Sequence, residues 1–313
     1  MKITILNDCF FNEEHLSRLR SLGDLTVFED TSTVEVAVER TADSEIVIGD
    51  QYLIDFNKSY FDSVPRLKML AINTTAFNKI DLVSATAKGV QIANTPGYSQ
   101  RAVAELAIGL MFSVVRRIPY GERRNRENTD EPDPASQEGR ALVGYNLEGK
   151  VLGVVGYGGI GKEVAKIASG IGMNVIGWNR TKRDGIKLVE LEELVRTSDV
   201  IVVTLAYSDD LKHLLSKDLL AKLKPNAVVI NMGEGQLIDT EALYELLKNN
   251  KIKGSAFDLA RFDKEDPFLK LDNFIKTPHI GSYTEESFYK NLPDMIVENV
   301  TTFVSGGKKN IVN

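Results

Sequence analysis

Cysteine and long apolar runs are both scarce in this sequence. Cys9 is the only cysteine among 313 residues, which excludes a disulfide framework within the chain and favours a reducing compartment. Cys9 itself is expected to be a small core residue. No segment approaches the roughly 18 uncharged apolar residues of a membrane span, and the first apolar run is too short for a signal peptide. These features predict a cytoplasmic protein with no membrane partner.

Basic residues and histidines are also few. The chain has 38 Lys and Arg against 44 Asp and Glu, a formal net charge of −6, which argues against nucleic acid as a partner because phosphate backbones are bound by clustered Lys and Arg. The three histidines and the single cysteine lack metal-ligand spacing, so no metal is predicted. Hydrophobic residues make up 43% of the chain, enough for a packed core, and the length favours two domains.

Short apolar runs alternate with helix-length segments along most of the chain. Strands spaced in this way are typical of βαβ units, in which helices cover both faces of a parallel sheet. The sequence therefore predicts an α/β fold. The expected strands lie at 2–6, 45–49, 67–72, 90–93, 151–156, 174–178, 199–205, 227–231, 254–258 and 274–277.

Two breaks interrupt this alternation. Pro96-Gly97 precedes a long apolar helix expected at 101–118, and the polar stretch 125–139 is typical of an exposed loop. The second break lies at 277–282, and one more helix is expected after it at 285–305. We expect the domain boundaries near these breaks.

A glycine-rich turn follows the expected strand 151–156. In a dinucleotide-binding turn, Gly156 would permit the tight bend, Gly158 would let the backbone approach a pyrophosphate, and Gly161 would allow the helix to pack closely on the strand. The N-terminus of that helix would face the phosphates. The competing interpretation is an ordinary strand–turn–helix that happens to be rich in glycine. The turn has the sequence Gly156-Tyr157-Gly158-Gly159-Ile160-Gly161.

The end of the next expected strand bears on the choice of cofactor. NAD sites usually carry an Asp or Glu there, which binds the ribose hydroxyls, but this chain has Asn179, followed by Arg180 and Thr181. Asn179 would not repel a 2′-phosphate, and Arg180, with Lys182 or Arg183, could pair with it. We expect NADP as the cofactor and NAD as the second choice. The alternative is a solvated basic turn without a ligand.

Several further short motifs follow one another along the chain. They are Asn94-Thr95-Pro96-Gly97, Ala102–Ala107, the glycine turn, Leu223-Lys224-Pro225 with Val228–Asn231, Leu237–Asp239 with Glu241–Leu243, and Thr277–Ser282. With these motifs, the chain from about Leu70 to Thr284 resembles the D-isomer-specific 2-hydroxyacid dehydrogenases.

The resemblance implies two Rossmann-like, doubly wound parallel-sheet domains with a cleft between them. Residues 1–99 and 285–313 would form the substrate (catalytic) domain, and residues 100–284 the dinucleotide-binding domain. The apolar helix at 101–118 resembles the dimerisation helix of the family and so implies a homodimer. Such a helix could equally be plain core.

The resemblance also implies catalysis by a proton-transferring His, a carboxylate that holds it, and an Arg that binds the substrate carboxylate. His279, within Thr277–Ser282, matches the family His. His15 and His213 have the character of ordinary surface or packing residues. Leu205 and Asp258, at the ends of two further expected strands, complete the expected cofactor contacts.

The carboxylate is expected just before Pro267, in a loop longer than the family pattern. Asp266 ranks first and Glu265 second as the partner of the catalytic His. The alternative for either residue is a charged, solvated turn.

The family Arg is missing. Glu234 stands at its position in Asn231-Met232-Gly233-Glu234-Gly235. Losing the Arg–carboxylate contact removes about 1.5–3 kcal/mol, and a like charge at about 4 Å adds roughly 4 kcal/mol at an effective dielectric near 20. A standard 2-oxo acid would thus bind roughly 10³-fold more weakly. Arg261 or the pair Arg123 and Arg124 could supply a replacement cation.

These residues predict an NAD(P)-dependent oxidoreductase that acts on a CH–OH group of a small molecule other than a standard 2-oxo acid. Glu234 could face a cationic or hydroxyl-rich group, or form hydrogen bonds as a neutral acid. One alternative is a cofactor-binding sensor or scaffold protein without turnover, and another is a family-typical dehydrogenase with a rerouted Arg.

Overall fold

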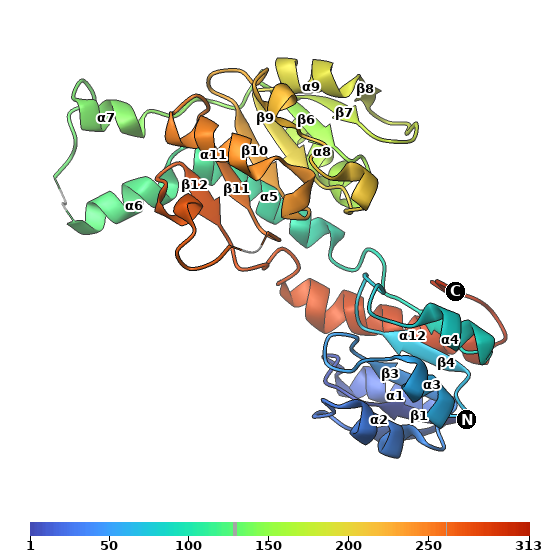
Figure 1. The fold of residues 1–313 in the computed structure, drawn as a ribbon. Helices are drawn as coiled ribbons and strands as arrows, with labels where there is room; N and C mark the ends of the chain where they lie inside the picture. Colours follow the sequence, from blue (N-terminus) through green and yellow to red (C-terminus); the bar gives the residue numbers. More distant parts are fainter. Residues whose placement is uncertain (128–129, 261) are drawn as a thin grey trace. The chain divides into compact units, whose positions relative to one another are not determined.

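The computed structural model describes residues 1–127, 130–260 and 262–313 (Figure 1). By internal contacts the chain forms two units, Met1–Ser99 with Tyr283–Asn313 (unit 1) and Gln100–Ser282 (unit 2). Both units are layers of helices around a parallel sheet, so the predicted α/β fold is confirmed. Among the described residues, no helix is long and apolar enough to cross a membrane.

Unit 1 is built on a five-stranded parallel sheet of order β2-β1-β3-β4-β5, the order found in flavodoxin-like folds. Its elements are β1 (Lys2–Ile5), α1 (Glu13–Leu22), β2 (Asp24–Val27), α2 (Val34–Thr41), β3 (Ile46–Gly49), α3 (Lys58–Ser63), β4 (Met69–Ile72), α4 (Leu82–Ala87), β5 (Gln91–Ala93), the π-helical turn η4 (Ser287–Asn291) and α12 (Leu292–Val304).

The two faces of this sheet carry separate cores. Side chains alternate along a strand, so Val47 faces a cluster with α2, α3 and α4, while Ile46 and Ile48 face a cluster with α1 and α12. The C-terminal helix α12 thus joins the N-terminal part of the chain by burying Ile296 and Val300 against its sheet. Burial on both faces explains why β3 and β4 are continuous apolar runs.

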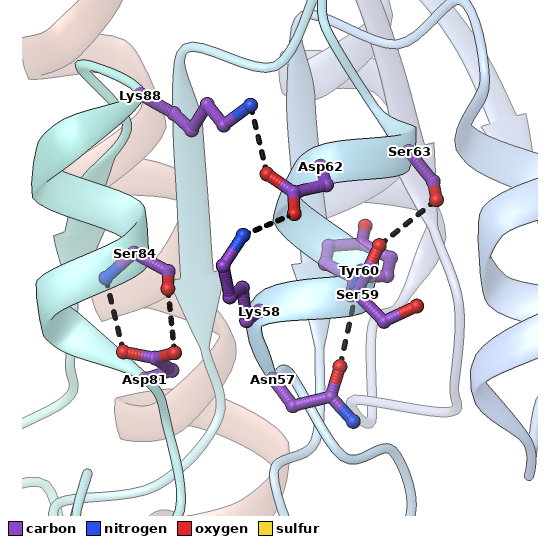
Figure 2. Close-up of polar contacts among 9 residues, drawn as sticks. All are labelled: Asn57, Lys58, Ser59, Tyr60, Asp62, Ser63, Asp81, Ser84 and Lys88. Carbon is purple, nitrogen blue, oxygen red and sulfur yellow. Dashed lines mark hydrogen bonds and ion pairs between the residues drawn. The ribbon is translucent and has the colours of Figure 1, made fainter.

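Polar side chains cap and connect the short helices α3 and α4 (Figure 2). The Asn57 side chain accepts a hydrogen bond from the Tyr60 N–H, and that of Asp81 accepts one from the Ser84 N–H. Asp62 accepts ion pairs from Lys58 and Lys88, and hydrogen bonds from these two ammonium groups lower its pKa to about 2. Side-chain caps of this kind satisfy helix N–H groups that have no intrahelical partner.

Unit 2 is built on a seven-stranded parallel sheet of order β12-β11-β10-β9-β6-β7-β8. Helices α5 and α8 cover one face, and α9, α10 and α11 cover the other. Its elements are α5 (Gln100–Val115), α6 (Ile118–Glu127), α7 (Gln137–Leu142), β6 (Val151–Val155), α8 (Gly159–Gly170), β7 (Asn174–Trp178), β8 (Lys187–Leu188), α9 (Leu191–Thr197), β9 (Val200–Val203), η1 (Asp209–Leu211), α10 (Lys217–Leu220), β10 (Val228–Asn231), η2 (Gly235–Leu237), α11 (Thr240–Lys248), β11 (Gly254–Phe257), η3 (Pro267–Lys270) and β12 (Phe274–Lys276).

Some elements differ from the sequence prediction. The sequence did not predict β2 and β8, because their residues are half-buried or exposed and form no apolar run. The helix expected at 101–118 ends at Val115, since Arg117 adopts a left-handed conformation (φ 56°) before α6 begins. The helix expected at 285–305 is a π-helical turn followed by α12, and α6 and α7 occupy both ends of the loop expected at 125–139.

Candidate functional site

The carboxyl edge of the unit 2 sheet collects most of the candidate site residues. In an open parallel sheet every strand ends at the same edge, and ligands bind outside that edge where the strand order reverses. Here the reversal lies between β6 and β9. The residues just beyond β6, β7, β9, β10, β11 and β12 are, in turn, Gly156, Asn179, Leu205, Glu234, Asp258 and His279.

The glycine turn after β6 has the geometry that a pyrophosphate requires. Gly156 has φ 102°, and a Cβ there would lie 2.8 Å from Leu205 Cγ. A Cβ on Gly161 would lie 2.2 Å from the Gly156 carbonyl oxygen, so α8 packs directly on the turn. Around Gly158 there is open space, and this N-cap of α8 has no side-chain cap. The first N–H groups of α8 are therefore available to phosphate oxygens.

The other three residues of the turn are held by contacts within unit 2. Tyr157 and Ile160 pack into it, and Gly159 lies close to the Gln100 side chain. Tyr157 is buried and its hydroxyl donates to the Gly185 carbonyl oxygen at 3.2 Å. Ile160 packs against the core cluster that includes α5 and α8. A Cβ on Gly159 would lie 2.2 Å from the Gln100 side chain, so the side chain that follows the break at Pro96-Gly97 touches the turn.

Asn179 links the end of β7 to the glycine turn. Its Oδ1 accepts a hydrogen bond from the Tyr157 N–H at 3.0 Å, and its Nδ2 donates to the Thr181 carbonyl at 2.8 Å and hydroxyl at 3.2 Å. Arg180 is mostly exposed and pairs with Asp210 of η1 at 2.9 Å. Exposed ion pairs contribute about 0–1 kcal/mol, so a phosphate could displace Asp210 at small cost.

The position of Glu234 is fixed by a short turn after β10. Buried Asn231 accepts the Gly233 N–H at 3.0 Å and donates its Nδ2 to the Glu234 carbonyl oxygen at 3.2 Å. A Cβ on Gly233 would lie 2.6 Å from the Leu205 carbonyl oxygen. These contacts bind the turn to the loop after β9 and place Glu234 at the start of η2.

A buried carboxylate holds the loop that carries His279. The Asp258 Oδ1 accepts the Thr277 hydroxyl at 2.6 Å and the Ile280 N–H at 2.9 Å, and its Oδ2 accepts the Gly281 N–H at 2.9 Å. The Asp258 carbonyl oxygen accepts the His279 N–H at 3.1 Å. His279 is exposed and adopts a left-handed φ of 57°. Asp258 thus positions the histidine.

Neither predicted carboxylate partner contacts His279 in the part of unit 2 that the structure describes. The Asp266 Oδ1 instead accepts the Phe268 N–H at 3.0 Å as the N-cap of η3, and Glu265 is exposed and 3.7 Å from Lys270. The alternative that these residues lie in a solvated turn therefore describes Glu265 well.

The cations considered as replacements for the missing Arg have other partners or cannot be placed. Arg123 pairs with Asp272 at 2.6 Å, and Arg124 pairs with Glu138. Arg261 lies outside the described residues.

A further cation, Lys276, lies next to the buried carboxylate that holds the His279 loop. It donates a hydrogen bond to the Asp258 carbonyl oxygen, and burial lowers the pKa of its ammonium group.

A cavity of about 580 Å³ lies beside Glu234 in unit 2. Its lining includes Asp266 and His213 as well as Phe262 and Phe268. From the sequence, His213 was expected to be an ordinary surface or packing residue, because no local motif points to it. It reaches the cavity because its N–H bonds to the Gln236 carbonyl oxygen at 2.7 Å, which ties the segment after η1 to η2.

Comparison with known proteins identifies the family. Residues 108–281 match the family model described as D-isomer specific 2-hydroxyacid dehydrogenase, NAD binding domain. A glyoxylate reductase of Thermococcus litoralis is 33% identical over 268 residues, which are 82% of this chain and 80% of that protein. A glycerate dehydrogenase of Methylorubrum extorquens is 32% identical over 291 residues, 91% of this chain and 90% of that one.

The fold has close counterparts among solved structures. An acyclic imino acid reductase in complex with NADPH and D-Arg is 30% identical, with a TM-score of 0.86 and 100% of both chains covered. This chain therefore belongs to the D-isomer-specific 2-hydroxyacid dehydrogenase family. It is an oxidoreductase of the NAD(P)-dependent type, and the predicted family, fold and enzyme class are confirmed.

Replacing Gly161 by Ala should weaken cofactor binding. The new Cβ would overlap the Gly156 carbonyl oxygen at 2.2 Å and push α8 away from the turn. Overpacking of this kind costs about 1–3 kcal/mol, so we expect a ten- to hundredfold rise in the Kd of the nicotinamide cofactor, measured by fluorescence titration. Gly170→Ala, at the far end of α8 with no atom within 4 Å of the new Cβ, is the control and should bind normally. Equal affinity of both variants would contradict the packing argument.

Replacing Asp258 by Asn should destabilise unit 2 and lower kcat. The amide would turn an NH₂ group toward backbone N–H donors, which removes charge-assisted hydrogen bonds worth about 1.5–3 kcal/mol. Denaturant unfolding measures the change in the free energy of unfolding, and steady-state turnover measures the change in kcat. Asp263→Asn, at an exposed carboxylate of the next loop, should change stability by less than about 0.5 kcal/mol. A stable Asp258→Asn protein with normal kcat would show that the loop does not depend on this carboxylate.

Proposed function

We propose that this protein is an NADPH-dependent reductase of a C=O or C=N carbon in an oxo or imino acid other than the small 2-oxo acids. One observation carries the proposal. The glycine turn and the His279 loop both lie at the carboxyl edge of unit 2, while Glu234, predicted from the sequence to stand at the position of the family Arg, lines a cavity at that edge. The cofactor half of the site is thus retained and the substrate half is changed.

NADPH is favoured over NADH by the end of β7. Asn179 carries no charge that would repel a 2′-phosphate, and Arg180 needs only to exchange its exposed partner Asp210 to bind one. The imino acid reductase that shares this fold was solved with NADPH. Leu205 packs against Gly156 and is proposed to line the same cofactor site.

The chemistry divides between cofactor and protein. The nicotinamide, when bound, supplies a hydride. His279 donates a proton to the substrate oxygen or nitrogen, since an imidazole can act as a general acid. Asp258 holds the loop that presents this imidazole. Asp266 and Glu265 remain sequence predictions for a carboxylate that supports it.

The relatives bear on the substrate class. Their names include glyoxylate reductase and glycerate dehydrogenase, and the imino acid reductase was solved with D-Arg. Because Glu234 would repel the carboxylate that the family Arg binds, we favour a substrate whose group near Glu234 is cationic or neutral. A substrate of this kind is also consistent with the D-Arg complex of the relative.

A homodimer and a cytoplasmic location are each proposed from a single feature of the structure. Phe112, Ile118 and Val143 are exposed apolar side chains on or beside α5, α6 and α7, which supports a homodimer formed through this part of unit 2. The unpaired, buried Cys9 is consistent with a cytoplasmic protein.

Cofactor choice can be tested at Arg180. Arg180→Ala should raise the Kd of NADPH by about ten- to hundredfold, because one charge-assisted contact with the 2′-phosphate is lost, and should leave the Kd of NADH unchanged. Asp210→Asn, which releases Arg180, should tighten NADPH binding by up to about fivefold. The exposed Arg196 of α9 provides the control variant Arg196→Ala. Preference of the wild type for NADH would overturn the cofactor assignment.

Turnover can be tested with both cofactors and a panel of acids. We expect glyoxylate, hydroxypyruvate and pyruvate to be reduced with kcat/KM below about 10⁴ M⁻¹ s⁻¹, the lower end of ordinary enzymes. Longer 2-oxo acids, with and without ammonia, should be better substrates. His279→Asn, whose side chain tolerates a left-handed φ, should lose about 10²–10⁴-fold in kcat while its cofactor Kd stays the same.

Three outcomes separate the hypotheses. Efficient reduction of the small 2-oxo acids would mean a family-typical dehydrogenase in which another cation replaces the Arg. Cofactor binding without turnover on any acid would favour the sensor or scaffold alternative, for which Glu234 is the supporting observation. Normal kcat in His279→Asn would remove His279 from the mechanism.

A further inference from the structure

The cavity beside Glu234 is built from four separate segments of unit 2. His213 comes from the segment after η1, Glu234 from the turn after β10, and Phe262 and Asp266 from the long loop after β11, while Phe268 belongs to η3. Its volume of about 580 Å³ falls in the range of roughly 300–1,000 Å³ that is typical of small-molecule sites.

Among the described residues that line this cavity, the acidic and basic side chains other than His213 are both carboxylic acids. Glu234 and Asp266 are its carboxylates, and no Lys or Arg is among the described residues that line it. In the described parts of the chain, the Glu234 carboxylate makes no hydrogen bond or ion pair, while one oxygen of Asp266 caps η3. His213 is the remaining titratable group of the lining. This described part of the lining favours a cation over an anion.

One wall of the cavity is aromatic and firmly packed. Phe262 and Phe268 lie 5.2 Å apart between ring centroids, and both pack against Phe274 at 5.5 and 4.8 Å. Tyr244 of α11 packs against Phe268 at 5.4 Å. Aromatic faces carry partial negative charge and bind guanidinium and ammonium groups, most strongly where water is excluded.

The turn that carries Glu234 is held against this wall. A Cβ on Gly235 would lie 3.1 Å from the Ala260 Cβ, so the start of η2 lies against the segment that follows β11. Together with the Asn231 contacts, this packing fixes the backbone of the turn that carries Glu234 beside the cavity. The backbone of this part of the site is thus preformed, which lowers the entropy cost of binding a ligand there.

We propose that this cavity is a subsite for a cationic group, a guanidinium or a primary ammonium, at the end of the substrate side chain. The inference rests on the proposed reductase function, because it takes the substrate to be an oxo or imino acid. Glu234 and Asp266 bind the cation, and Phe262 and Phe268 form the apolar face beneath it. Glu234 is then a specificity residue. It favours a cationic group in the substrate, whereas an Arg at the same position would favour a carboxylate.

Binding of two ligands of nearly the same shape, one cationic and one neutral, tests the proposal without turnover. D-Arginine ends in a guanidinium and D-citrulline in a neutral urea of the same shape, and calorimetry with NADPH bound measures both. We expect wild-type protein to bind D-arginine at least tenfold more tightly than D-citrulline. Glu234→Gln and Asp266→Asn should each reduce D-arginine affinity by about ten- to hundredfold and leave that of D-citrulline within twofold.

The variants are chosen so that shape is retained. Gln is isosteric with Glu, and Asn is as good an N-cap as Asp, so η3 keeps its cap in Asp266→Asn. Glu241→Gln is the matched control, because this exposed carboxylate follows the cavity residue Thr240 and is not part of the lining. It should bind both ligands as the wild type does.

The outcomes separate this inference from the proposed function. Equal binding of the two ligands, no binding of D-arginine at millimolar concentration, or a preference that survives Glu234→Gln would each overturn the cation subsite. In a parallel assay, the 2-oxo acids of arginine and citrulline are offered with NADPH. Selective binding of D-arginine without reduction of either acid would contradict the reductase function and leave the cation subsite in place. Reduction of both acids at equal kcat/KM would support the reductase function and contradict the cation subsite.

Discussion

The parallel hydrogen-bond ladder of the unit 2 sheet is the constraint on which the site depends. Strands β6, β9, β10, β11 and β12 pair in register from one to the next, so their carboxyl ends lie along one edge. Residues as far apart in sequence as Gly156 and His279 thereby come to lie just beyond the same edge of the sheet. Because parallel strands need a long crossover between them, each turn at this edge is separated from the next by a helix-length segment.

The turns at this edge are themselves held by buried polar groups. Asn231 closes the turn that carries Glu234, and Asp258 binds the N–H groups that follow His279. A buried carboxylate requires partners for its oxygens, and in the structure the His279 loop supplies three. The same contacts that satisfy Asp258 fix the histidine, so stability and positioning arise from one set of hydrogen bonds.

Local sequence was sufficient for several features of this edge. The alternation of apolar runs predicts the α/β class, and Gly156 and Gly161 each fill a role that the backbone geometry requires. Half-exposed β2 and β8 escaped prediction because strands without a buried apolar run carry little local signal. The end of α5 at Val115 goes with the left-handed conformation of Arg117, and Pro119, two residues further on, is the local signal for a helix break that the expected helix at 101–118 did not use.

The sequence by itself determined the family and the nicotinamide cofactor, because these depend on short motifs whose residues are neighbours in the chain. Only the tertiary structure decided that Asp258 holds the His279 loop, that Asp266 caps η3, and that His213 shares a cavity with Glu234. Those facts depend on side-chain direction and on contacts between segments that sequence spacing does not bring together.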